Sequence, residues 1–140
     1  MEPSHAALLE ECRVGHLGTV GPSGRPHLVP VCYALYEGLI VIAVDEKPKR
    51  ETLDLARLRN IRRDARVTLL VDRYSEDWSR LAWLRIDAIA SVQPAGGAHP
   101  GALAALRARY PQYAAMVLEE RPLVTLQAER VSSWQAGGNS

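Results

Sequence analysis

The chain has 140 residues, of which 47% are hydrophobic and 24% charged, and this predicts one folded domain over 1–140. Its net charge of +1 argues against general attraction to nucleic acid or to an anionic membrane. The longest strongly apolar run, 39–44, is too short to span a bilayer. Because only Cys12 and Cys32 are present and the start lacks a signal-peptide pattern, we expect a cytoplasmic protein without a disulfide framework.

Hydrophobic periodicity and turn residues divide the chain into short strands and helices. Ser4 is a suitable N-cap for the first helix, and the turn residues at 21–24 predict a hairpin between the first two strands. The β-branched run 39–44 predicts a strand that is buried on both faces. In chain order we expect a helix over 6–11, strands over 13–20, 25–35 and 39–44, a helix over 52–63, strands over 66–74 and 81–92, helices over 101–110 and 113–119, and a strand over 123–133.

These elements predict a mainly β protein with α-helices, built as a six-stranded antiparallel barrel with peripheral helices. The first three strands are joined by turns too short for the crossovers that parallel neighbours require. A doubly wound parallel sheet is therefore disfavoured. Beyond the last strand, residues 135–140 are expected to form a flexible tail.

Basic residues are concentrated after the third strand. This pattern indicates a phosphate site, because cations at a sheet end precede the start of a helix. A solvated helix face with internal ion pairs remains an alternative. Nucleic-acid binding is less favoured, since no aromatic residues are interleaved for base stacking. The cations are Lys47, Lys49, Arg50, Arg57, Arg59, Arg62, Arg63 and Arg66.

Other catalytic signatures are missing from the sequence. There is no CxxC, HxH, HExxH or GxSxG motif, so neither a zinc site nor a nucleophilic hydrolase is predicted. The stretch 72–83 combines Trp78 and Trp83 with arginines and an acidic turn. It could form a cofactor wall or a subunit contact; alternatively, Trp83 belongs to the core and Trp78 covers a hairpin end.

Six segments, taken together and in order, resemble the flavin-binding split β-barrel family of pyridoxamine 5′-phosphate oxidases. Within that family they look most like the actinobacterial branch that uses the deazaflavin coenzyme F420. The match covers nearly the whole chain, and only the ordered set is specific. The segments are Gly-Thr-Val at 18–20, Gly-Arg-Pro-His-Leu-Val-Pro-Val at 24–31, Val-Asp-Glu-Lys-Pro-Lys-Arg at 44–50, and the stretches 58–67, 72–78 and 107–113.

The resemblance implies a homodimer with two cofactor sites at the subunit interface. Each site would hold coenzyme F420, which is favoured, or FMN, and would use residues of both chains. The phosphate would be bound by Lys47, Lys49, Arg50 and Arg57. The ring would be lined by Pro30, Val31, Cys32, Val44 and Asp45, while Trp78 and Arg80 would reach in from the partner.

The activity implied is hydride transfer between the cofactor and a small organic substrate, with no nucleic-acid or membrane partner. Because the cofactor ring carries the hydride, such an enzyme needs no catalytic triad. One alternative is an FMN-dependent pyridoxamine phosphate oxidase-type enzyme, although no equivalent of the C-terminal arginine and histidine that bind pyridoxal phosphate is recognised. A second alternative is a non-catalytic flavin- or haem-binding protein on the same fold.

Overall fold

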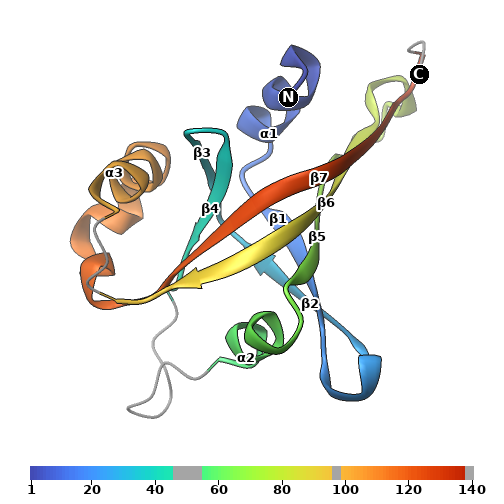
Figure 1. Cartoon of the computed structure of the whole chain (residues 1–140). Helices are drawn as coiled ribbons and strands as arrows, with labels where there is room; N and C mark the ends of the chain where they lie inside the picture. Colours follow the sequence, from blue (N-terminus) through green and yellow to red (C-terminus); the bar gives the residue numbers. More distant parts are fainter. Residues whose placement is uncertain (46–54, 96–98, 138–140) are drawn as a thin grey trace.

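A computed structural model describes residues 1–45, 55–95 and 99–137 (Figure 1). The helices are α1 (Pro3–Glu11), α2 (Ala56–Arg63) and α3 (Pro100–Arg109), with short 3-10 turns over Pro22–Gly24, Trp78–Arg80, Pro111–Ala115 and Leu118–Glu120. The strands are β1 (Gly15–Val20), β2 (Pro26–Val31), β3 (Ala34–Tyr36), β4 (Leu39–Ala43), β5 (Arg66–Arg73), β6 (Ala82–Gln93) and β7 (Leu123–Gln135).

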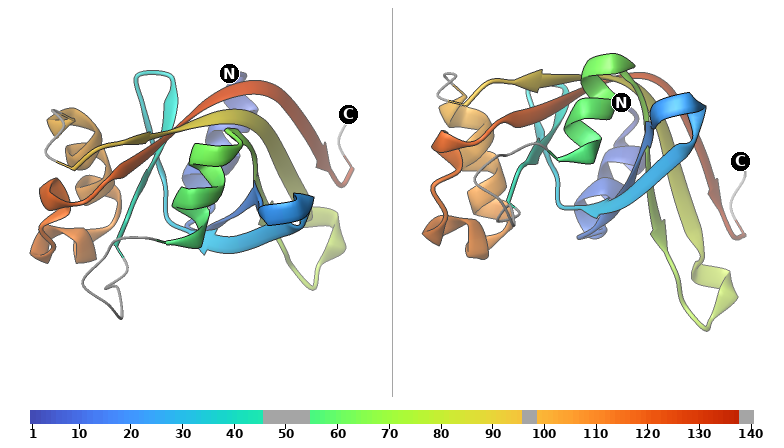
Figure 2. Two further views of the ribbon diagram at one scale, coloured as in Figure 1. Left: turned by 60° about the horizontal axis from the view of Figure 1, so that its bottom comes forward. Right: turned by 90° about the horizontal axis from the view of Figure 1, so that it is seen from below.

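Within the described residues, the strands form one seven-stranded sheet in the order β2-β1-β5-β6-β7-β4-β3. Every pair in it is antiparallel. Figure 2 shows that the sheet curls strongly, with α2 lying against the curl and α3 packed beside β3 and β4. The predicted mainly β architecture, an antiparallel barrel with peripheral helices, is therefore confirmed, with seven strands instead of six.

The extra strand arises because the chain changes partner within 25–35. The segment β2 pairs with β1, but β3 pairs with β4 at the opposite edge of the sheet. Cys32 and Tyr33 form the crossing between them. Side chains keep alternating between the two cores through this crossing, so the sequence pattern carries no sign of the change.

Two hydrophobic cores meet at β4. The larger lies within the curled sheet, under α1 and α2; the smaller lies between α3 and strands β3 and β4. Ile40, Ile42 and Val44 point into the larger core, whereas Val41 and Ala43 point into the smaller. The prediction that this segment is buried on both faces is confirmed.

A two-residue turn joins β3 to β4. Its residues, Glu37 and Gly38, have φ values of 49° and 77°, and the flanking Tyr36 and Leu39 are paired. Positive φ at both central positions is the signature of a type I′ turn, whose twist matches that of the strands it joins. Glycine adopts this conformation at no steric cost, so Gly38 suits its position.

The helix α1 is anchored at its C-terminal end. Arg109 donates hydrogen bonds to the carbonyl oxygens of Leu9, Glu10 and Cys12 at 2.9, 3.0 and 2.5 Å. The Tyr33 hydroxyl lies 2.7 Å from the carbonyl oxygens of both Leu9 and Cys12. Carbonyls in the last turn of a helix lack intrahelical donors, and a cation there also stabilises the helix dipole. Arg109, Tyr33 and Tyr110, whose hydroxyl contacts Tyr33, form what we name the α1 clamp.

The start of α1 differs from the prediction. Ser4 lies inside the helix, and the N-cap is Glu2, whose side chain makes no capping hydrogen bond. The reason is Pro3, because its fixed φ suits the first helical position and moves the start of the helix forward. At the other end of the chain, Gln135 is the last residue of β7, and residues 138–140 of the expected tail lie outside the described residues.

Candidate functional site

A pocket of about 240 Å³ opens where β2 and β4 end. We name it the strand-end pocket. Its position follows from the topology, because the end of β2, the end of β4, the segment before β1 and the first turn of α2 converge there. The described residues that line it are Val14, Pro30, Val31, Cys32, Ala43, Asp45 and Arg57.

The sequence prediction named five of these lining residues: Pro30, Val31, Cys32, Asp45 and Arg57. The structure brings them together from segments that are far apart in the chain. Pro30 fits because β2 is an edge strand, where a residue without a backbone N–H costs no ladder hydrogen bond.

Arg57 supplies positive charge to this pocket. It lies in the first turn of α2 and is only 5% exposed. Its guanidinium stays protonated and offers several donors in a planar fork, a geometry that suits phosphate or carboxylate oxygens. Holding a charged group in such a buried position is costly, so a charge beside a pocket is typical of a binding site.

Asp45 adds a carboxylate to the same lining, and Tyr113 holds it in place. The Tyr113 hydroxyl donates to Oδ2 of Asp45 at 2.5 Å, and Tyr113 is 3% exposed. Burial, followed by the hydrogen bond to Asp45 and the nearby Cys32 thiol, raises the pKa of Tyr113 far above its usual value. The hydroxyl therefore remains a proton donor to Asp45 across the working pH range.

The remaining predicted site residues lie elsewhere. The Val44 side chain is buried in the larger core, and its carbonyl oxygen accepts a hydrogen bond from Arg121 at 3.3 Å. Trp78, which is 68% exposed, and Arg80 sit on the turn between β5 and β6 and do not line this pocket of their own chain. Lys47, Lys49 and Arg50 lie outside the described residues.

Sequence reasoning missed three residues at this site. Val14 and Ala43 line the pocket, but small apolar side chains give no signal of binding in a sequence. Tyr113 lies 68 residues from Asp45 in the chain, so only the folded structure shows their contact. The predicted helix over 113–119, which would have placed Tyr113 differently, is instead a pair of short 3-10 turns.

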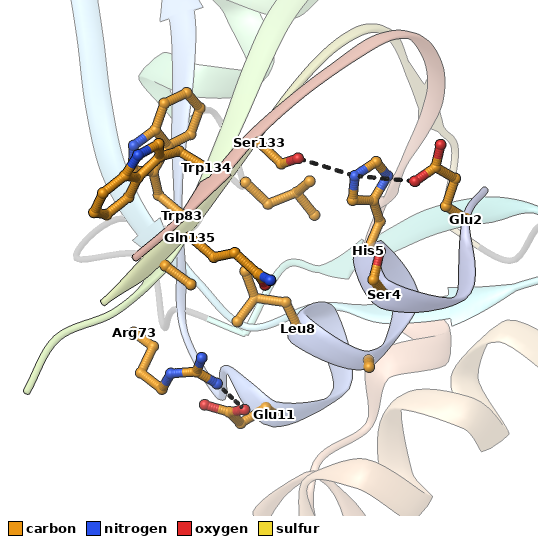
Figure 3. Close-up of a pocket in the computed structure, with 13 residues that line it drawn as sticks. Glu2, Ser4, His5, Leu8, Glu11, Arg73, Trp83, Ser133, Trp134 and Gln135 are labelled. Carbon is orange, nitrogen blue, oxygen red and sulfur yellow. Dashed lines mark hydrogen bonds and ion pairs between the residues drawn. The ribbon is translucent and has the colours of Figure 1, made fainter. Parts of the chain in front are cut away.

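A different pocket, of about 420 Å³, lies between α1 and the ends of β5, β6 and β7. Figure 3 shows Trp83 and Trp134 on one side of it and His5 on the other, with the His5 ring 3.1 Å from the Ser133 hydroxyl. Its rim carries an ion pair between Arg73 and Glu11 at 2.7 Å. None of the predicted cofactor residues lines it.

The outer face of the sheet exposes apolar side chains over β2, β1, β5 and β6. Leu28 is 71% exposed and Leu70 38% exposed, and with Trp83 they surround a hollow of about 650 Å³. Trp83 is thus half-buried on this outer face and is not part of the core. An exposed apolar surface of this kind is typical of a protein interface.

Comparisons with known structures show where this fold recurs. A conserved hypothetical protein from Mycobacterium tuberculosis matches at 27% identity and a TM-score of 0.73, over 96% of this chain and 85% of its own. A heme binding protein from Mycobacterium smegmatis matches at 22% identity and a TM-score of 0.74, over 99% of this chain and 57% of its own. An FAD-binding protein from Mesorhizobium loti matches at 17% identity and a TM-score of 0.69, over 93% of this chain and 89% of its own.

No curated protein matches the chain. No helix among the described residues is long and apolar enough to cross a membrane.

The family is shown by the sequence as a whole. The family model for pyridoxamine 5′-phosphate oxidase matches residues 1–135. That match includes every strand and both sides of the strand-end pocket. The chain therefore belongs to the pyridoxamine 5′-phosphate oxidase family.

Proposed function

We propose that the protein is an oxidoreductase that transfers a hydride between coenzyme F420, which we favour, or FMN and a small organic substrate. The observation that carries this proposal is the strand-end pocket, where a buried guanidinium and an apolar wall meet at a sheet edge. We place the activity in the cytoplasm, where the free thiols of Cys12 and Cys32 would stay reduced.

The residues of the pocket suit such a cofactor. Arg57 would bind an anionic group, while Pro30, Val31 and Ala43 offer apolar surface to the edge of a flat ring. Asp45, held by Tyr113, would accept a hydrogen bond from a ring N–H. The bound cofactor would supply the hydride, and the chain's own part is to orient the ring, exclude water and balance charge. Lys47, Lys49 and Arg50 remain proposed phosphate ligands.

A second copy of the chain would complete the site. At about 240 Å³ the pocket is smaller than the roughly 300–1,000 Å³ typical of small-molecule sites, so a tricyclic ring needs further walls. The exposed apolar outer face around Leu28 offers a surface for the partner. In the proposed homodimer, Trp78 and Arg80 of each protomer would reach the partner's pocket; Trp78 is suited to this because its ring is exposed.

The test is a fluorescence titration of cofactor-free protein with coenzyme F420 and, separately, with FMN. We expect micromolar or tighter binding of one of them. Arg57→Met should weaken this binding at least about tenfold, because it removes charged hydrogen bonds. The matched control is Arg62→Gln, which removes an exposed cation from the same helix. Binding of neither cofactor, or equal loss in both variants, would contradict the proposal.

The homodimer has its own test. Leu28→Asp places a charge on the outer face, at a side chain that is 71% exposed in the protomer. We expect light scattering to report a dimer for the unchanged protein and a monomer for this variant, with cofactor affinity lost in parallel. A monomeric unchanged protein at micromolar concentration would rule out the shared site.

Non-catalytic haem binding is a second candidate, favoured by the similarity in fold to the heme binding protein from Mycobacterium smegmatis. In this chain the Cys32 thiol would be the axial ligand available at the strand-end pocket. Titration with hemin distinguishes the two functions. A Soret shift that disappears in Cys32→Ala, together with no F420 or FMN binding, would favour the haem function.

A further inference from the structure

The strand-end pocket contains a carboxylate that the fold holds in one position. Asp45 lies two residues beyond the end of β4, and its Oδ2 accepts the hydrogen bond from the Tyr113 hydroxyl at 2.5 Å. The Tyr113 side chain is buried in the smaller core, where the centroids of its ring and the Tyr110 ring are 5.5 Å apart. The donor to Asp45 therefore belongs to the packed core and keeps the carboxylate at the pocket.

The backbone of Tyr113 is fixed as well. Arg107, in α3, donates hydrogen bonds to the carbonyl oxygens of Tyr113 at 3.2 Å and of Met116 at 2.8 Å. Its guanidinium also forms an ion pair with Glu119 at 2.7 Å. These contacts hold the turn that carries Tyr113 against α3. The position of the Asp45 carboxylate thus depends on a continuous set of contacts that runs from the pocket to α3.

A fixed negative charge beside a pocket acts on any change of charge inside it. Asp45 is half-buried, so its charge is screened less than it would be in bulk water. A hydride consists of two electrons and one proton, so a ring that gains a hydride becomes more negative by one charge. Asp45 disfavours the ring in that state, whereas Arg57, in the lining of the same pocket, favours it.

We propose that Asp45, positioned by Tyr113, biases the redox preference of the strand-end pocket by weakening the binding of a reduced flavin or deazaflavin ring relative to the oxidised ring. This inference rests on the proposed function, because it needs such a ring in the pocket. Asp45 acts on the ring through its charge, and Tyr113 is a positioning residue that keeps this charge in place. Weaker binding of the reduced ring lowers the reduction potential of the bound cofactor, so hydride donation to a substrate becomes more favourable.

The experiment measures the reduction potential of FMN or coenzyme F420, whichever the full chain binds, by anaerobic spectroscopic titration at constant pH and ionic strength. The affinities of the oxidised and reduced forms are measured in parallel. Asp45→Asn keeps the size of the side chain and removes its charge. We expect it to shift the preference about tenfold or more toward the reduced form, which raises the potential by about 30 mV or more for a two-electron couple.

Tyr113→Phe tests the positioning role. We expect it to raise the potential by less than Asp45→Asn does, because the carboxylate remains but loses the donor that holds it. The matched control is Glu120→Gln, which removes an exposed carboxylate outside the described lining and should leave the potential unchanged. Retained affinity for the oxidised ring shows that the pocket of each variant is folded.

Three outcomes would overturn the inference alone. These are an unchanged preference in Asp45→Asn, a fall of the potential in Tyr113→Phe, and an equal shift in Glu120→Gln, which would reveal a general effect of net charge. Binding of neither FMN nor coenzyme F420 by the unchanged protein is a distinguishable failure, because it overturns the proposed function and the inference with it.

Discussion

Two buried arginines of this protein do different work. The Arg109 side chain is 9% exposed, and its guanidinium donates hydrogen bonds to backbone carbonyls at the end of α1. Arg57, 5% exposed, lines the strand-end pocket. The residue type and degree of burial are alike, so neither property separates a structural arginine from a binding one. What separates them is their surroundings, because Arg109 donates to backbone carbonyls at the end of α1 whereas Arg57 lines a pocket.

The largest effect is expected from Arg109→Met. The change leaves the carbonyls of Leu9, Glu10 and Cys12 without this donor, and removes the cation from the rings of Tyr33 and Tyr110, 5.1 and 5.4 Å away. We expect the free energy of unfolding to fall by about 3 kcal/mol, measured by urea denaturation. We expect Arg57→Met, unlike Arg109→Met, to weaken cofactor binding, and equal losses of affinity would remove the distinction.

A pair of tyrosines sharpens the same comparison. In the clamp, the Tyr110 hydroxyl accepts from the Tyr33 amide at 3.1 Å and lies 2.9 Å from the Arg13 carbonyl oxygen. At the pocket, the Tyr113 hydroxyl donates to Asp45 and lies near the Cys32 thiol. We expect Tyr110→Phe to cost about 2 kcal/mol and Tyr113→Phe about 1 kcal/mol. Only Tyr113→Phe should alter cofactor affinity, which titration of both variants would show.

Alkaline pH should destabilise both regions. Burial raises the pKa of Tyr33 in the clamp and of Tyr113 at the pocket above the usual value of 10. As pH rises, the unfolded chain loses these protons before the folded chain does. The two tyrosines therefore contribute their full share to the free energy of unfolding below pH 10, and this share falls as pH rises beyond it. Urea midpoints on either side of that pH test this. Tyr33→Phe should make the decline shallower, and an unchanged slope would contradict the assignment to Tyr33.

The smallest effect belongs to Glu10→Gln. The carboxylate of Glu10 lies 3.2 Å from Arg109, but its side chain is 63% exposed. Exposed ion pairs contribute little because water and salt screen them, so we expect about 0.5 kcal/mol or less. A larger loss in thermal denaturation would mean that the clamp depends on charge pairing more than on its carbonyl contacts.

Much of this fold could be predicted from the sequence because its signals are local. The alternation through β6, with Leu84 and Ile86 inward and Arg85 outward, is confirmed by their burial. The partner of a strand is not a local property, and the division of 25–35 into β2 and β3 was therefore missed. The core position of Val44 has the same origin, because it depends on which face of β4 the pocket adjoins.

The candidate site was predictable in part for a related reason. Arg57 belongs to a basic stretch that stands out in the sequence, whereas Asp45 and Cys32 were named through the family resemblance, and the structure brings all three to one pocket. The contact between Tyr113 and Asp45 joins two segments through the packing of the smaller core. No periodicity or motif encodes a contact of that kind, so the residue that positions Asp45 could not be named in advance.

The turn at Glu37 and Gly38 has a consequence at a distance. Because β4 is apolar on both faces, sliding it by one residue would bury no polar side chain, and the pattern alone corrects such an error weakly. The turn therefore helps to fix the register of β4. A one-residue change of register would exchange the faces of Ala43 and Val44 and move Asp45 away from Tyr113. The lining of the strand-end pocket thus depends on two residues that are not part of it.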